Sequence, residues 1–416
     1  MTASQSPEQP PPTHGPKPQT QHRSPPLKQK MALGFKSLLD GARKLAIGDD
    51  GGGGGGGGTT AKLEELFPRT DPAVDGDDCT RDCESCHVHY PRNFKVEESD
   101  LLYGHVSAWS THVLVATGKS DWVRDVEDEK GSVMQAFGKA QGPSNGKMKL
   151  SASNIPTPSH TTDYSEPTTV LLLPAFTVIE KVTPAAVPAL VSEYINRAPT
   201  TTTPLGPVSL PRSLSSESAT TTTITESPPP SWPPEARQLV ARPCPHRALI
   251  LLCSQRTRDA RCGQSAPLLR KELERHLRTL GLYRDLDDER PGGVAVYFIS
   301  HVGGHKYSAN VMVYRRPDAF GVDAVERGRL GEGEEVQVRV GAGAGKGAGK
   351  EGEKGEGEGE GGEVEDVGAA QCIWLARVRP EDCENIVKYT VLQGKVVKPE
   401  TQLRGGFDRG KGLLSW

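Results

Sequence analysis

The chain has 416 residues, and 47 glycines and 34 prolines stand against only 5 Trp, 9 Tyr and 8 Phe. This composition excludes a chain that is folded along its whole length, because too few large apolar side chains are present to offset the ordering entropy everywhere. The formal net charge of −3 excludes an overall field that would gather nucleic acid or an anionic membrane. The longest mainly apolar stretch, residues 170–179, is far shorter than the roughly 20 residues that span a bilayer.

Residues 1–70 form a low-complexity tail with a Pro-rich leader and an uninterrupted glycine run from Gly51 to Gly58, and we expect them to be disordered. The first thirty residues contain no apolar core of a secretory signal, so the eight cysteines are expected to be thiols or metal ligands in a reducing compartment. A cytoplasmic location is therefore predicted. A short amphipathic stretch after Met31 leaves a mitochondrial presequence as the alternative.

The next segment, residues 71–197, is predicted to be a small N-terminal α/β domain. Its apolar patterns indicate a strand over 111–117, a helix over 131–140, a strand over 169–181 and a helix over 184–196. A Ser/Thr/Pro-rich stretch over 198–240 follows and has no periodicity. It is predicted to be a flexible linker.

Residues 241–416 are predicted to form a second domain with clearer patterns. Strands are expected over 247–253, 293–300, 309–314 and 372–378, and helices over 267–280 and 380–392. The resulting order β-α-β-β-β-α predicts a thioredoxin-like α/β domain. A Gly/Glu/Lys-rich run over 331–368 is expected to be a solvated insertion at a hairpin tip.

The strongest group of metal-ligating residues lies where two predicted strands of this domain end. Cys253 closes the first strand and Cys262 follows in an Arg-rich loop, while the strand over 293–300 runs into the sequence His301-Val-Gly-Gly-His305. In a thioredoxin-like order the two strands are neighbours, so two thiolates and two imidazoles are expected at one sheet edge. Two Cys and two His make a complete ligand set for a metal centre.

Several chemistries compete for this set. Dithiol exchange is disfavoured, because oxidoreductases of this fold carry C-x-x-C after the first strand, whereas eight residues separate Cys253 from Cys262. Zinc stays open, since Cys2His2 is a normal tetrahedral zinc set, although its cysteines usually lie two to four residues apart.

The residues around this set resemble the sucrase/ferredoxin-like family, which is related to thioredoxin-like ferredoxins. The matching stretches are residues 244–253, the loop to Cys262-Gly263, the run His301-Val-Gly-Gly-His305-Lys306 and its continuation to Asn310, residues 373–378, Asp82-Cys-Glu-Ser-Cys86, Tyr90-Pro91 and Leu102-Tyr-Gly-His105. The resemblance implies a 2Fe–2S cluster in the C-terminal domain. By motif position its ligands would be Cys253, Cys262, His301 and His305.

A second cysteine group precedes the first predicted strand: Cys79, Cys83 and Cys86, with His87 and His89 adjacent. The spacing C-x3-C-x2-C with a histidine is compatible with zinc, but no second ligand pair supports such a site. Reduced structural thiols are the default expectation for the three cysteines.

Two further thiols and the end of the chain complete the set of candidates. Cys372 and Cys383 fall in a predicted strand and at a helix start, and core thiols are expected there. The terminal sequence Leu414-Ser415-Trp416 resembles the short tail by which some cytosolic iron–sulfur proteins engage their assembly machinery, and a frayed terminus is the alternative.

These observations predict a 2Fe–2S electron-transfer protein with an unknown redox partner protein. No substrate pocket is evident in the sequence, so an electron carrier is expected rather than an enzyme. The alternatives are a zinc-stabilised adaptor without redox activity and a reductase component whose partner is a separate protein. Neutral histidine ligands further predict a higher potential than in an all-cysteine ferredoxin, and a potential that falls as pH rises.

Overall fold

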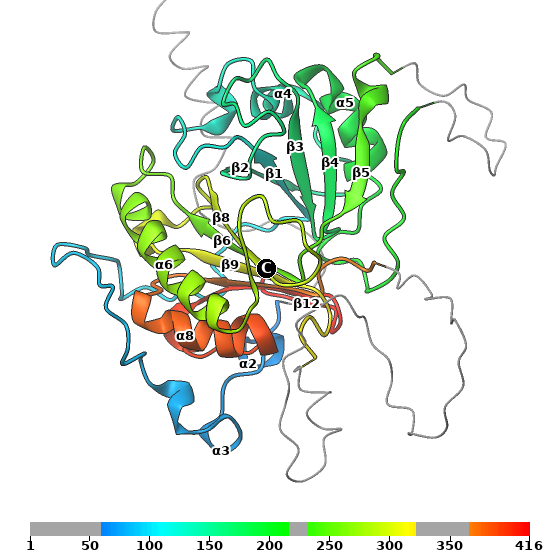
Figure 1. Ribbon diagram of the computed structural model, residues 1–416. Coiled ribbons are helices and arrows are strands. Elements are labelled where there is room, and N and C mark those ends of the chain that lie inside the picture. The colour runs from blue at the N-terminus through cyan, green and yellow to red at the C-terminus, as the bar shows by residue number, and fades with distance from the viewer. Residues whose placement is uncertain (1–59, 216–231, 322–365) are drawn as a thin grey trace, which may run out of the picture. The chain divides into compact units, whose positions relative to one another are not determined.

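The computed structural model describes residues 60–215, 232–321 and 366–416 (Figure 1). These residues form a mixed α/β structure with a 12-stranded mixed sheet and few helices, which confirms the predicted α/β class. Most of the predicted tail, the centre of the predicted linker and nearly all of the Gly/Glu/Lys-rich insertion lie outside the described residues.

The first half of the sheet has the strand order β2-β1-β3-β4-β5. Its strands are β1 (Thr111–Ala116), β2 (Met148–Ser153), β3 (Thr168–Leu173), β4 (Thr177–Val182) and β5 (Val240–Pro243). β1 and β2 are parallel, with α4 (Val133–Lys139) between them in the chain, and the other neighbours are antiparallel. α5 (Val187–Leu190) follows β4.

The second half repeats this arrangement with the order β8-β6-β9-β10 and then adds β11 and β12. Its strands are β6 (Ala248–Cys253), β7 (Tyr283–Arg284), β8 (Val294–Ile299), β9 (Val311–Arg315), β10 (Gln371–Leu375), β11 (Leu403–Asp408) and β12 (Leu413–Leu414). The helices are α6 (Ala260–Thr279), α8 (Cys383–Asn385) and α9 (Pro399–Gln402). Again the first two long strands, β6 and β8, are parallel, and β9 is antiparallel to β6.

The period of two along β6 divides its side chains between two cores. Ile250 and Leu252 pack with α6 residues such as Leu273. Leu249 and Leu251 belong instead to a core that also contains apolar residues of β1 and β3 from the first half. The two halves therefore share a core as well as the single antiparallel pairing of β2 with β8.

Two predicted element boundaries are wrong. The strand expected over 169–181 is a hairpin of β3 and β4, because Pro174 lacks the amide that a ladder needs and Phe176 takes a positive φ of 53° in the turn. The helix expected from Pro267 begins seven residues earlier at Ala260. The Asp259 side chain accepts the amide of Arg261 and caps the helix, so Cys262 lies in its first turn rather than in a loop.

Residues 60–110 contain the short helices α2 (Leu63–Leu66) and α3 (Pro72–Asp75) and a 3-10 turn over Asp77–Thr80, and otherwise run as coil along the second half of the sheet. Polar contacts hold this coil in place: Asn385 donates to the carbonyl of Arg81 at 2.7 Å, and the Tyr90 hydroxyl donates to the carbonyl of Val378 at 2.7 Å. No helix within residues 60–215, 232–321 or 366–416 combines the length and apolarity that a membrane span requires.

Candidate functional site

The carboxyl ends of β6 and β8 lie side by side, and two of the four predicted ligands lie at or directly after them. Cys253 is the last residue of β6 and pairs in parallel register with Ile299, the last residue of β8, and His301 follows two residues later. Parallel pairing explains this placement, because it brings the carboxyl ends of both strands to one edge. Cys262 reaches the same edge from the first turn of α6.

The thiols of Cys253 and Cys262 are both buried and interact directly with each other. Interaction with the Cys262 thiol, together with the imidazole of His301, lowers the pKa of Cys253 to about 5. The same thiol pair and burial raise the pKa of Cys262. The lowered pKa favours the thiolate of Cys253, which is the form that binds metals.

The pKa values of other buried thiols shift in the opposite direction. Burial raises the pKa of Cys244 to about 11, and it also raises the pKa values of Cys372 and Cys383. All eight cysteines are buried and free of disulfide bonds. Burial alone therefore does not distinguish Cys253; its neighbours do.

The two imidazoles form a second pair. His305 lies in the short helical turn His305–Tyr307, with its Nδ1 atom 3.5 Å from Nε2 of His301 and with ring centroids 4.9 Å apart. Burial and the adjacent His301 lower the pKa of His305, so its ring favours the neutral form. Nδ1 of His301 is buried, and no partner for it lies within the residues that the structure describes. A buried nitrogen without a hydrogen bond is costly unless a ligand or ion completes it.

The loop that carries both histidines depends on glycine at position 304, where φ is 65°. A side chain there would meet the Arg404 guanidinium at 2.4 Å, so only glycine allows this approach. Donors then hold the loop carbonyls: Arg404 binds that of Gly303 at 2.9 Å, and Lys149 binds that of Val302 at 3.4 Å. Two buried or partly buried cations thus fix the backbone between the histidines.

Arg404 also binds Oδ1 of Asn310 at 3.0 Å, and Trp374 donates to the same oxygen at 3.1 Å. Sequence reasoning did not find Arg404, because its strand β11 reads Leu-Arg-Gly-Gly-Phe-Asp and lacks an apolar alternation. An arginine directly before two glycines that lie in a strand was the available signal, since such glycines permit close backbone approach.

The first half of the sheet supports the loop between Cys253 and Cys262. Gln255 is buried; it accepts the amide of His301 at 2.8 Å and donates to the carbonyl of Val123 at 2.6 Å. Thr257 binds Asp121 through both its amide and its hydroxyl. Gln255 therefore connects the histidine loop to the first half, as Lys149 of β2 also does.

Cations that the sequence placed around the set are paired with carboxylates. Lys306 lies 2.6 Å from Asp100, and Arg258 lies 2.5 Å from Asp125. Arg261 binds Asp259, the cap of α6. These pairs are partly solvated, so their main role at this site is to orient loops.

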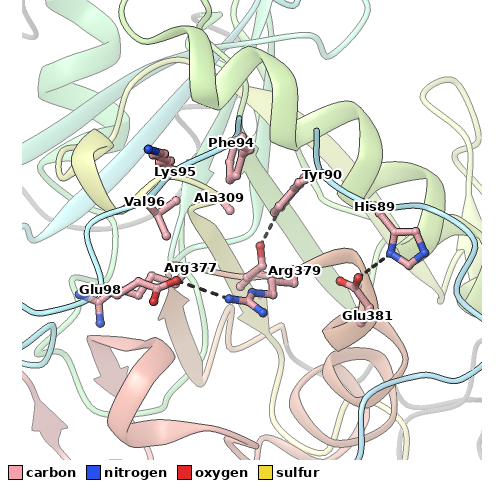
Figure 2. Close-up of a pocket in the computed structure, with 11 residues that line it drawn as sticks. His89, Tyr90, Phe94, Lys95, Val96, Glu98, Ala309, Arg377, Arg379 and Glu381 are labelled. Carbon is pink, nitrogen blue, oxygen red and sulfur yellow. Dashed lines mark hydrogen bonds and ion pairs between the residues drawn. The ribbon is translucent and has the colours of Figure 1, made fainter. Parts of the chain in front are cut away.

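A pocket of about 460 Å³ lies next to the histidine loop, a feature that the sequence did not reveal (Figure 2). Ala309 forms part of its wall, four residues after His305. The rest of the lining combines coil residues 89–98 with the segment after β10, and the polar members include Lys95, Glu98, Arg377, Arg379 and Glu381. Figure 2 shows the Tyr90 hydroxyl and the Arg379–Glu98 ion pair at the pocket rim.

The second cysteine group does not assemble with its neighbouring histidines. His89 pairs with Glu381 at 2.7 Å, and the Cys86 thiol donates to the carbonyl of Val88 at 3.2 Å. Cys83 contacts His276 of α6 instead, with 3.9 Å between Sγ and Nε2. The structure therefore does not bring Cys79, Cys83, Cys86, His87 and His89 together as one ligand set.

The end of the chain is packed rather than frayed. Leu414 lies in β12, Ser415 is buried, and the Trp416 ring stacks on Trp109 with centroids 4.2 Å apart. Edge pairing with β11 and aromatic stacking explain this order.

Known proteins resemble this chain over part of its length. It is 51% identical to actin patches distal protein 1 of Saccharomyces cerevisiae over 70 residues, which cover 17% of this chain and 22% of that protein. It is 26% identical to altered inheritance of mitochondria protein 32 of Clavispora lusitaniae over 153 residues, covering 37% of this chain and 33% of the relative. The matched segments thus span between a fifth and a third of these relatives. No solved structure matches the chain.

The sucrase/ferredoxin-like family model matches residues 102–405, a span that includes all four predicted ligands. This span covers well over half of the chain and most of the described sheet. The chain therefore belongs to the sucrase/ferredoxin-like family.

Proposed function

We propose that this chain is a ferredoxin-like electron carrier that holds a 2Fe–2S cluster through Cys253, Cys262, His301 and His305. The observation that carries the proposal is the arrangement of these side chains as two pairs, one of thiols and one of imidazoles. The family description, sucrase/ferredoxin-like, supports the same class of function.

The pairing supports a cluster over a single zinc ion. Around one tetrahedral zinc all four ligand atoms would lie within about 4 Å of one another. Among the described residues, no three of these four side chains bring their ligand atoms within 4.8 Å of one another. A thiol pair and an imidazole pair that meet through Cys253 and His301 fit a site with two metal ions, and bis-histidine 2Fe–2S centres place two Cys on one iron and two His on the other.

The ligand atoms of these four side chains also suit a 2Fe–2S cluster. The Cys262 thiol and the His301 imidazole lower the pKa of Cys253 and favour its thiolate, and the buried Nδ1 of His301 lacks a hydrogen-bond partner in the described structure. When bound, a 2Fe–2S cluster accepts and releases one electron. The chain's contribution is to keep the thiol pair buried and to hold the histidine loop by Arg404 and Lys149. Two positive side chains near the site favour the more negatively charged, reduced state.

The strand order β8-β6-β9-β10, with α6 between its parallel strands, supports a thioredoxin-like assignment for the second half. We propose the same core order for the first half, which the sequence analysis described only as α/β. A cytoplasmic site of action, a separate redox partner protein and delivery of the cluster through Leu414, Ser415 and Trp416 belong to the same proposal. The name of one matched relative, altered inheritance of mitochondria protein 32, refers to mitochondria, so the compartment should be measured by fractionation.

The deciding experiment is a visible absorption spectrum of the purified full chain together with iron, sulfide and zinc analysis. A brown protein with two irons and two sulfides per chain is expected. A colourless protein with stoichiometric zinc at this site would favour the zinc-stabilised adaptor instead. Cys79→Ser is a suitable control, because its buried thiol lies outside the four-residue set and the spectrum should not change.

A redox titration tests the histidine ligands. The potential should be higher than that of an all-cysteine ferredoxin and should fall by about 59 mV per pH unit for each proton taken up with the electron. A flat, strongly negative potential from neutral to alkaline pH would remove His301 and His305 as ligands.

A further inference from the structure

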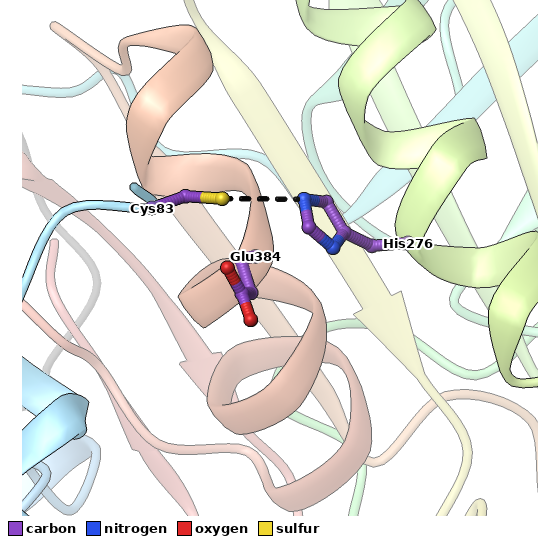
Figure 3. A group of neighbouring side chains, drawn as sticks. All are labelled: Cys83, His276 and Glu384. Atoms are coloured by element: carbon purple, nitrogen blue, oxygen red, sulfur yellow. Dashed lines mark hydrogen bonds between the residues drawn. The ribbon is translucent and has the colours of Figure 1, made fainter. Parts of the chain in front are cut away.

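Three side chains from distant parts of the chain converge at a second place, beside α6 and α8 (Figure 3). Cys83 comes from the coil after the turn Asp77–Thr80, His276 from the last turns of α6, and Glu384 from α8. One ligand atom of each lies within 4.8 Å of the other two. Cys83 is 9% exposed, whereas Glu384 is exposed to solvent.

We propose that Cys83, His276 and Glu384 bind a zinc ion. A thiolate, an imidazole and a carboxylate are all regular zinc ligands, and three protein ligands leave a fourth tetrahedral position for water. A distance of 3.9 Å between Cys83 Sγ and His276 Nε2 is close to the spacing of two ligands on one zinc. This site is separate from the cysteine–histidine pairs of the proposed cluster.

The contacts of Arg275 show that the donor lone pairs face this place. Its Nη2 atom lies 3.0 Å from Nε2 of His276 and 3.6 Å from the sulfur of Cys83. A guanidinium can only donate, so Nε2 of His276 must be the unprotonated nitrogen. Arg275 thus holds a positive charge next to the sulfur of Cys83 and Nε2 of His276. A metal ion bound there would supply a positive charge in place of Arg275.

The Arg275 guanidinium also interacts with residues outside the proposed zinc site. Arg275 lies 2.7 Å from Glu272 and donates to Ser85 at 3.2 Å. Zinc binding therefore requires Nη2 of Arg275 to turn away from His276 and Cys83, while Nε of Arg275 can keep its 2.9 Å bond to the buried Glu272 carboxylate. It also follows that Arg275 opposes zinc, so its removal should tighten binding.

Zinc at this place would fix the coil of residues 60–110 to the second half of the sheet. The amide of Cys83 already donates to the carbonyl of Glu381 at 3.0 Å. Further along the same coil, the amide of Glu97 donates to the carbonyl of Lys306 at 3.0 Å, next to His305. The coil thus links the proposed zinc site to the histidine loop.

Cobalt(II) is the probe of choice, because a thiolate–cobalt bond gives a near-ultraviolet charge-transfer band. The full-length Cys253→Ser/Cys262→Ser chain is titrated, so that the other thiol pair contributes no band. One saturable cobalt per chain with that band is expected, and stoichiometric zinc should displace it. Absence of a saturable band would overturn the proposal.

Variants then assign the ligands. Cys83→Ser should abolish the band, whereas Cys79→Ser, a matched buried thiol of the same coil, should keep it. Glu384→Gln changes an exposed residue and leaves the fold intact, so its affinity for cobalt must fall at least about tenfold. Arg275→Met should raise the affinity. An unchanged band in Cys83→Ser, or unchanged affinity in Glu384→Gln, would contradict the assigned ligand set.

Discussion

The two halves of the sheet share the strand order of their first four long strands but differ at the carboxyl ends of their parallel pairs. The last pair is Cys253 with Ile299 in one half and Ala116 with Ser153 in the other. Cys253 therefore corresponds to Ala116, and His301 corresponds to Ile155. The first half has the same backbone arrangement but apolar residues at both ligand positions, so the arrangement alone does not make a metal site.

The first half has instead a supporting role. Its loop after β1 binds the loop between Cys253 and Cys262 through Gln255, Thr257 and Arg258. The proposed ligands in one half are therefore positioned by contacts from the other. The comparison predicts that equivalent substitutions in the two halves will have very different effects.

The largest difference is expected at the last residue of the first parallel strand. Cys253→Ser should abolish iron and sulfide binding, because the soft thiolate donor is lost. Ala116→Ser places a serine at the equivalent position of β1, and this variant should still bind iron and sulfide. Iron and sulfide per chain measure the outcome, and Cys244→Ser controls for the loss of a buried thiol. Full iron content in Cys253→Ser would instead direct attention to Cys244.

A second contrast compares two buried arginines, Arg404 in β11 and Arg409 directly after it. Arg404→Met leaves the carbonyl of Gly303 and the side chain of Asn310 without their charged donor, which should cost about 3 kcal/mol of stability and lower the iron content. Arg409→Met removes similar bonds to the carbonyls of Thr203 and Ala369. It should destabilise the chain comparably but leave the redox potential unchanged.

Unfolding experiments and redox titration separate the two effects. Equal potentials in both arginine variants would show that Arg404 stabilises the fold without positioning the histidine loop.

The sequence predicted those features that local pattern determines. β6, β8 and β10 are continuous apolar runs, and their order placed Cys253 and His301 at one edge. β11 was not predicted, because its glycines at 405 and 406 are required by close contacts with Ser415 and Cys372 rather than by any local pattern. The start of α6 was also not predicted, because the Asp259 cap was outweighed by Pro267, which normally marks a first helical turn.

Long-range contacts account for the remaining differences. Arg404 reaches the histidine loop across the sheet, and Cys83 meets His276 from a separate segment of coil. Spacing along a chain carries no information on such meetings, whereas Cys253 and His301 were predictable because a parallel strand pair fixes their separation.

The end of the chain gives a third prediction. Deleting Trp416 removes its stacking on Trp109 and its edge contact with Phe407, so stability should fall by about 2 kcal/mol. The alternative of a frayed terminus is therefore wrong, because deleting Trp416 from a frayed terminus would leave stability unchanged. Trp416→Phe should retain most of the stacking. Chemical denaturation measures stability, and iron content in cells compared with iron content after reconstitution tests the role in assembly.

If the tail recruits assembly machinery, Trp416→Phe should lower iron in cells while leaving reconstituted iron and stability nearly unchanged. Equal iron in cells for the wild type and the variant would leave the tail with only a packing role.

The smallest expected effect is a change in the pH dependence of stability. It concerns His112, which contacts both halves of the sheet. This β1 residue is fully buried, and its ring nitrogens lie 3.0 Å from the hydroxyls of Tyr314 in the second half and of Ser151 in the first. Burial, and secondarily Lys149, holds the pKa of His112 well below its ordinary value of 6.5. The folded chain therefore keeps this ring neutral while the unfolded chain protonates it below pH 6.5.

The free energy of unfolding should consequently fall as pH decreases below about 6.5, by about 1.4 kcal/mol per pH unit from this one group. His112→Gln keeps a donor and an acceptor for the two hydroxyls but does not titrate, so its stability should fall less steeply with acid. His246→Gln in the second half is the matched variant, because burial lowers the pKa of His246 to about 4 and gives a similar contribution between pH 6.5 and 4. Denaturant unfolding at pH 5 to 8 measures the difference. Above pH 7.5 the gap between wild type and His112→Gln should become constant, since the His112 ring is then neutral in both the folded and the unfolded state. A gap that stays constant down to pH 5 would mean that His112 is protonated in the folded chain, and that the two halves tolerate a positive charge in the core they share.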